Sequence, residues 1–345
     1  MSDRPYAPSW LDRLTDAVGR LPGPYGIWYL AIGLVFALVR TIIGWTDGSY
    51  PVGTFFRVHV IDGLIPVYFL FVIHLLDEMA GRALTDYRSK LRGGDDDFET
   101  LRYQLTTLPW RTSLVVGILG LVAGAVYIPI LLSPEDVEAS HYLTAASAGV
   151  DTVLSGLSGL MMVMFGYHTI HQLRMISRIY TRHTEVSIFD TSPLYALSRV
   201  TAVTSISLLF FTYVYLAFYG DWQINSPSNA ILLGAILVTA LLTFVLPLSG
   251  AHRLLVAAKR DRLSVVSRRL ETATDALHAK TDAGQFTTAI APITDAIDGL
   301  LKEREVVAKT KTWPWDPDAV RAVATAVILP ILIWIATRVL ERFGV

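Results

Sequence analysis

The chain has 345 residues, of which 52% are hydrophobic and 17% are charged, and its formal net charge is −1. This composition is too apolar for an ordinary soluble domain and indicates a protein embedded in a membrane. Cysteine is absent, which excludes disulfide bonds, thiolate metal sites and cysteine nucleophiles.

Residues 1–25 carry an amphipathic pattern and lack the basic-then-apolar pattern of a signal peptide. Trp10 and Leu11 begin an apolar face that recurs at helical spacing, with Asp12 and Arg13 on the opposite face. We therefore expect a short helix that lies on the cytoplasmic surface of the membrane.

Seven apolar stretches follow, and each is long enough for a helix that crosses a bilayer core of about 30 Å. These predicted spans are 26–46, 55–77, 112–133, 142–170, 199–220, 228–251 and 319–341. Residues 26–251 would contain transmembrane helices 1–6, and residues 313–345 an interfacial turn and transmembrane helix 7. The predicted fold class is an all-α integral membrane protein with seven transmembrane helices.

The distribution of basic residues predicts the orientation of the chain. If the N-terminus is inside, 25 of the 29 Lys and Arg residues lie in or next to inner segments, and only four lie toward the outer side. Such an excess marks the cytoplasmic side of a membrane protein. We expect an N-inside, C-outside topology, the inverse of rhodopsin-like receptors.

The longest inner segment, 252–312, is predicted to form a cytoplasmic helical hairpin. Apolar residues recur at spacings of three and four from Val256 to Leu277, and the pattern resumes after Gly284. A narrow apolar seam of this kind is typical of two antiparallel helices that anchor or oligomerise a protein.

Ionisable residues within the spans form one layer in the outer half of the membrane. Counted from the outer ends, Arg40, Asp62 and Asp151 lie at similar depth, about 9–14 Å below the surface at 1.5 Å per residue. His59 lies one turn from Asp62, and Ser155 continues the polar face of the fourth span. The layer fits either a structural ion pair of Arg40 with one of the two acids or a pocket for a ligand.

Two further groups complete the candidate sites. Tyr213 and Tyr215, in the outer part of the fifth span, carry hydroxyls that could line the same pocket. The seventh span offers candidates for a hydrophobic constriction of a pore: Val327, Ile328, Ile331, Leu332 and Ile335.

Four histidines lie near inner helix ends. His168 and His171 have the spacing of a metal-binding pair, and His74 or His252 could supply a third ligand. Histidines that form hydrogen bonds at the membrane interface are the preferred interpretation, so no metal and no cofactor are predicted. None of the common nucleotide-binding, hydrolase or metalloprotease motifs is present, and an enzyme is the least favoured class.

The layout of the whole chain resembles the insect odorant and gustatory receptor superfamily. The resemblance rests on seven spans with inverted topology, short outer loops and a long helical insertion before the last span. It implies a tetrameric ligand-gated cation channel with an inner anchor domain, a pore lined by the last helix and a ligand pocket in the outer half. The corresponding segments are 171–198, 252–312 and 319–341. The family's C-terminal signature is missing from residues 325–343.

We therefore predict an oligomeric channel or chemoreceptor-like protein of the cell membrane, with a tetramer favoured. Its expected partners are membrane lipids, further copies of the chain and a small organic ligand, and not nucleic acid. Two alternatives stay open. One is a scaffold or signal transducer that docks a cytosolic partner through 252–312, and the other is a proton-coupled transporter that uses Asp62 and Asp151.

Overall fold

A computed structural model describes residues 5–131, 145–184, 194–219, 227–284 and 290–342, and every regular element in these ranges is helical. Five of the described helices are long and apolar enough to cross a membrane: α2 (Tyr25–Thr46), α3 (Arg57–Asp86), α7 (Ala145–Arg182), α8 (Leu194–Tyr219) and α10 (Pro227–Asp282). The predicted all-α membrane fold is confirmed at this level. The count of seven crossings and the orientation stay predictions.

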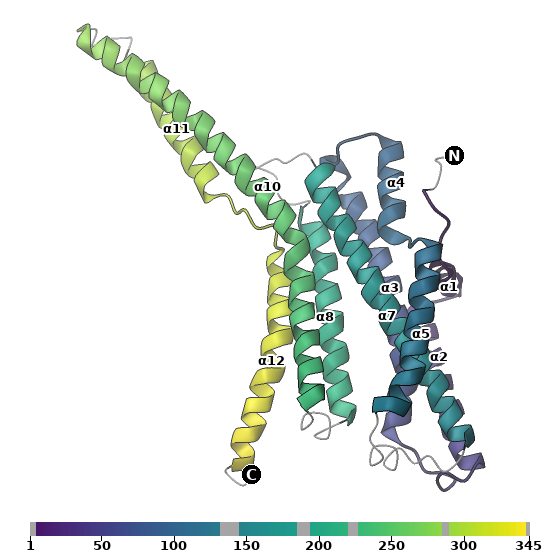
Figure 1. Cartoon of the computed structure of the whole chain (residues 1–345). Coiled ribbons are helices and arrows are strands. Elements are labelled where there is room, and N and C mark those ends of the chain that lie inside the picture. Colours follow the sequence, from purple (N-terminus) through teal and green to yellow (C-terminus); the bar gives the residue numbers. More distant parts are fainter. Residues whose placement is uncertain (1–4, 132–144, 185–193, 220–226, 285–289, 343–345) are drawn as a thin grey trace.

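Two more helices occupy the remaining predicted spans. These are α5 (Trp110–Leu131) and α12 (Pro317–Arg342). The described part of α12 packs mainly against α8, whereas α5 packs along α7. Figure 1 shows that α12 ends at the opposite end of the bundle from the connection that carries α4 (Asp95–Thr106).

Helix α5 lies unusually close to α7 because glycines face each other across the contact. A Cβ on Gly124 would lie 2.3 Å from the carbonyl oxygen of Ser155, and a Cβ on Gly159 would lie 2.6 Å from the carbonyl oxygen of Gly120. Helices in lipid associate through such small residues, because they allow close packing of the two backbones.

The outer surfaces of α2 and α5 are apolar. Large aliphatic side chains are exposed along one face of α2: Ile27, Leu30, Leu34, Leu38 and Ile42. On α5 the exposed set is Leu114, Val115, Ile118, Leu119, Leu121, Val122 and Val126. Continuous apolar faces of this extent are unfavourable in water but match the hydrocarbon of a bilayer.

Short helices at one end of the bundle tie the chain together. Helix α1 (Trp10–Gly19) begins with a capping box, in which the Ser9 hydroxyl accepts the backbone N–H of Asp12 while the Asp12 carboxylate accepts the N–H of Ser9. The same carboxylate accepts the N–H of Leu108, 3.2 Å away, at the start of α5. The 3₁₀ turn η1 (Arg88–Lys90) and α4 connect α3 to α5.

The second half of α10 leaves the bundle as a long arm, along which α11 (Ala291–Lys309) returns in the opposite direction (Figure 1). Lys259 on α10 donates to the carbonyl oxygens of Ala308 and Thr310, which caps the C-terminus of α11. The turn after α11 stacks Trp313 on His252, with ring centres 3.9 Å apart, before α12 begins.

Candidate functional site

The polar layer that the sequence predicts for the outer half is centred on an ion pair between α2 and α7. Arg40 is 1% exposed and donates from Nη2 to Oδ2 of Asp151 over 2.8 Å, while its Nε contacts Oδ1 of the same carboxylate. The contact is bidentate, the strongest geometry for an arginine and a carboxylate. Asp151, one of the two acids proposed from depth alone, therefore pairs with Arg40.

Tyr50 and His59 extend this layer toward α3. The hydroxyl of Tyr50 lies 3.5 Å from Nη1 of Arg40 and 3.3 Å from Nδ1 of His59. The ring of Tyr50 lies against Gly44, where a Cβ would be 2.1 Å from the ring carbon Cζ. Glycine at this position is therefore required for the tyrosine to reach the ion pair. Tyr50 and Gly44 were not among the sequence-based candidates.

The connection between α2 and α3 is fixed to the start of α7. Asp47 accepts the backbone N–H of Ser147 over 3.1 Å and also its hydroxyl. The hydroxyl of Ser49 lies 2.6 Å from that of Ser147, and both serines are buried. This network holds Asp151, one turn further along α7, opposite Arg40.

The other candidates of the outer layer lie on α3, α7 and α8. Ser155 donates to the carbonyl oxygen of Gly124 over 2.7 Å, so its hydroxyl lies in the α5–α7 contact. Asp62 is half-buried on α3. Tyr213 and Tyr215 are half-buried on α8, and Tyr215 lies against Phe211 with ring centres 6.0 Å apart.

The pore candidates on α12 are described in part. Val327 is half-buried, and Ile328 and Leu332 are 53% and 56% exposed. The side chains of Ile331 and Ile335 lie outside the described residues.

A second polar cluster, which the sequence did not predict as a site, lies between α3 and α7 near the ends that the predicted orientation places inside; it is called the inner cluster. Nε2 of His168 is 2.8 Å from Oδ1 of Asp77, and the two side chains are 2% and 16% exposed. The side-chain amide of Gln172 donates toward the same oxygen and toward the carbonyl oxygen of Leu76, each over 3.4 Å. Asp77 was treated as the end of a span, and its partner is 91 positions away.

The other three histidines considered as metal ligands have hydrogen-bond partners of their own. His171 donates from Nε2 to the carbonyl oxygen of Gln104 over 2.8 Å, and Nδ1 of His74 meets the Tyr29 hydroxyl over 2.9 Å. His252 donates to the carbonyl oxygen of Thr312 over 3.0 Å. Among the described residues no group of three or more potential ligands could hold a metal ion.

In the part of the chain that the structure describes, the fold is that of a helical membrane protein with two polar pairs between its helices, Arg40–Asp151 and Asp77–His168. Comparison with protein-family models, curated proteins and solved structures finds no match for the chain.

Proposed function

We propose that the protein is an oligomeric channel of the cell membrane in which α12 lies at the axis shared by several copies. One observation carries this proposal. The exposed face of α12 carries a row of two polar and two apolar side chains with the spacing of a helix–helix contact: Arg321, Thr325, Ile328 and Leu332. The opposite face, with Val323 at 4% exposure, packs on α8.

This row differs from the faces of the chain that fit lipid. The exposed face of α2 consists of large aliphatic residues, whereas the row on α12 begins with an arginine and a threonine at its inner end. At 1.5 Å per residue it extends for about 16 Å from Arg321 to Leu332. A polar entrance followed by Ile328 and Leu332 is the arrangement of a pore with a hydrophobic constriction.

The inner end of α12 is held firmly against the bundle. Arg199 on α8 donates to Asp316 over 2.5 Å, and the backbone N–H of Asp316 donates to the Ser198 hydroxyl over 3.3 Å. Burial alone would raise the pKa of Asp316, but the hydrogen bonds from Arg199 and from the backbone N–H of Asp318 outweigh it and lower this pKa. The carboxylate therefore stays charged at neutral pH and fixes where α12 begins.

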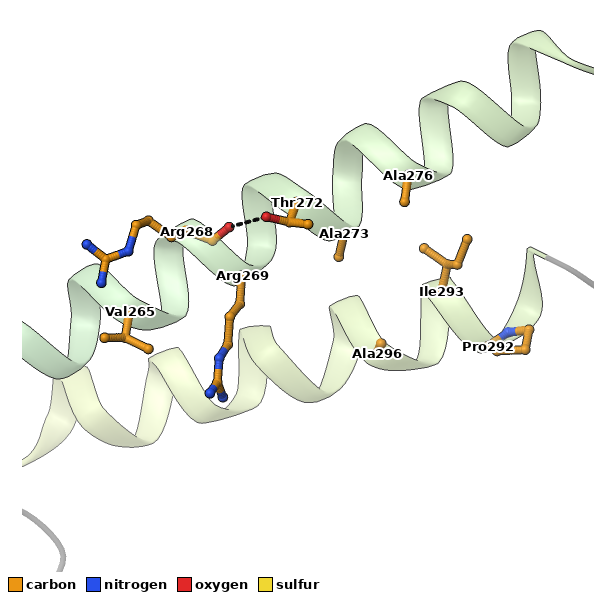
Figure 2. Close-up of a pocket in the computed structure, with 9 residues that line it drawn as sticks. All are labelled: Val265, Arg268, Arg269, Thr272, Ala273, Ala276, Pro292, Ile293 and Ala296. Carbon is orange, nitrogen blue, oxygen red and sulfur yellow. Dashed lines mark hydrogen bonds between the residues drawn. The ribbon is translucent and has the colours of Figure 1, made fainter.

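The arm offers a contact surface for neighbouring copies. Val266 and Val307 are the buried apolar side chains among the described residues 259–309, so most of the seam between α10 and α11 is only half-buried. Figure 2 shows a groove between the two helices toward the tip of the arm. Its lining is Val265, Arg268, Arg269, Thr272, Ala273, Ala276, Pro292, Ile293 and Ala296.

The occupant that we propose for this groove is the arm of a second copy. Arg268 and Arg269 are exposed beside the apolar floor of the groove, and Asp295 and Asp298 are exposed on α11. A second arm would cover the half-buried apolar residues and bring its acids to these arginines. Such ion pairs select partner and orientation in helical bundles.

The absence of cysteine allows a direct test of the axis. Ile328→Cys would be introduced into the full chain in lipid, and disulfide formation under mild oxidation would be measured by gel mobility. Around a shared axis the new thiols meet, so Ile328→Cys should form disulfide-linked dimers. Leu38→Cys is the matched control, because Leu38 is 51% exposed on α2 and should remain monomeric.

Conductance then distinguishes a channel from a scaffold. Purified protein in planar bilayers should conduct ions, and polar Ile328→Ser should increase that conductance because a constriction loses hydrophobic character. If the protein is a monomer in detergent and its Ile328→Cys variant forms no disulfide-linked dimer, the shared axis is contradicted. A cross-linked oligomer without conductance would favour the scaffold alternative.

A small organic ligand is proposed to bind in the outer half of the bundle. Support comes from the half-buried side chains of Tyr213 and Tyr215 on α8 and from the polar layer around Arg40. The ion pair itself is engaged internally, so we assign it the role of fixing α2 against α7.

A further inference from the structure

The inner cluster contains buried atoms that lack partners. Nδ1 of His168 and Oε1 of Gln172 have no hydrogen-bond partner among the described residues, although the two side chains are 2% and 1% exposed. They lie four positions apart on α7, so they occupy the same face of the helix, one turn from each other. The hydroxyl of Thr169, between them in sequence, is also unpartnered within the described chain.

Two buried atoms on one face of a helix, without a partner in the described part of the chain, call for a hydrogen-bonding partner. Leaving a buried acceptor unpaired costs about 1–3 kcal/mol, and the great majority of buried polar atoms in proteins pair with protein or with ordered water.

We propose that Asp77, His168 and Gln172 form a proton-binding site whose fourth member is a water molecule held between Nδ1 of His168 and Oε1 of Gln172. Water is the small molecule that satisfies both atoms in either protonation state. When the imidazole is neutral, its Nε2–H donates to Asp77, and the water donates one hydrogen to Nδ1 and the other to Gln172. When Nδ1 takes up a proton, the water turns to accept that N–H and still donates to Gln172.

Uptake of one proton changes the net charge of the Asp77–His168 pair from −1 to 0. A neutral pair is favoured in a buried site, because an uncompensated charge there is costly. The ionisable groups that act on Asp77 come from several elements: Asp12 on α1, His74 on α3 itself, and His168 and His171 on α7.

Water-edited solid-state NMR of the full chain, labelled with ¹⁵N-histidine and embedded in lipid, tests the proposal. The experiment transfers polarisation from water protons to side chains, and the signal of His168 is assigned as the one that disappears in His168→Gln. We expect transfer from water to the His168 ring in the unmodified chain and its loss in Gln172→Leu. Gln104→Leu makes the same chemical change on α4, where only the backbone oxygen contacts a histidine, and should leave the transfer unchanged.

Titration of the same samples tests whether the Asp77–His168 pair binds a proton. The His168 ring should change protonation state at a lower pH in Asp77→Asn, because the carboxylate no longer stabilises the imidazolium. No water transfer to His168, or equal transfer in Gln172→Leu, would overturn the bound water, and a titration unchanged by Asp77→Asn would overturn the proton site. If His168→Gln does not fold, density for a water between Nδ1 and Oε1 in a high-resolution structure decides, and its absence refutes the site.

Discussion

The Arg40–Asp151 pair predicts that removing one partner destabilises the fold far more than replacing both partners together. Asp151→Asn removes the charge opposite an arginine that is 1% exposed and leaves that charge buried without its counterion. Breaking a buried ion pair from one side costs about 3–5 kcal/mol. Replacing both partners, as Arg40→Met with Asp151→Leu, removes the buried charges together, and the loss should be much smaller than in Asp151→Asn.

Thermal unfolding in detergent measures these differences. The matched control is Glu78→Gln, which breaks the ion pair of Glu78 with Arg82; these side chains are 43% and 66% exposed. An exposed pair contributes about 0–1 kcal/mol, so the control should unfold almost as the unmodified chain does. Equal losses in Asp151→Asn and Glu78→Gln, or a double variant as unstable as Asp151→Asn, would refute the assignment of a buried structural pair.

Two further predictions concern other parts of the bundle. Gly159→Ala should lower the free energy of unfolding by about 1–3 kcal/mol, because its Cβ would meet backbone atoms of α5; Gly149→Ala on the same helix meets no atom within 4 Å and should cost nothing in the same assay. Burial raises the pKa of Asp12 from 3.8 to about 6 despite its hydrogen bonds with Ser9. The folded chain then binds the proton more tightly than the unfolded chain, so stability should rise by up to about 3 kcal/mol as the pH falls from above 6 toward 4. Asp12→Asn should lose this rise in melting curves, and an identical pH profile in both proteins would contradict it.

The class of the fold followed from the sequence, but the pairing of side chains across helices did not. Apolar stretches of about 20 residues are sufficient to predict membrane helices, because the bilayer sets their length. Depth along a helix placed Arg40, Asp62 and Asp151 in one layer. The rotation of α7 about its axis, which brings Asp151 to Arg40, depends on packing that the sequence does not reveal.

The inner cluster was missed for a related reason. Asp77 lies where a span was expected to end, and an acid at such a position needs no partner because water can solvate it. Helix α3 continues to Asp86, so Asp77 is covered by the bundle and meets His168 instead. The glycines between α5 and α7 did carry a signal: Gly120 and Gly124 are four residues apart, the spacing of a close helix contact.

The length of α10 has a mechanical consequence. One unbroken helix of 56 residues joins the membrane bundle to the tip of the arm, with Pro247 within it. From Pro247 to Asp282 the helix extends for about 50 Å at 1.5 Å per residue. Prolines are the usual places where helices bend, and a tilt of about 5° at this one would displace the tip by about 5 Å. A small movement among the membrane helices would thereby become a displacement of the arm's tip the size of a side chain, so α10 would act as a lever.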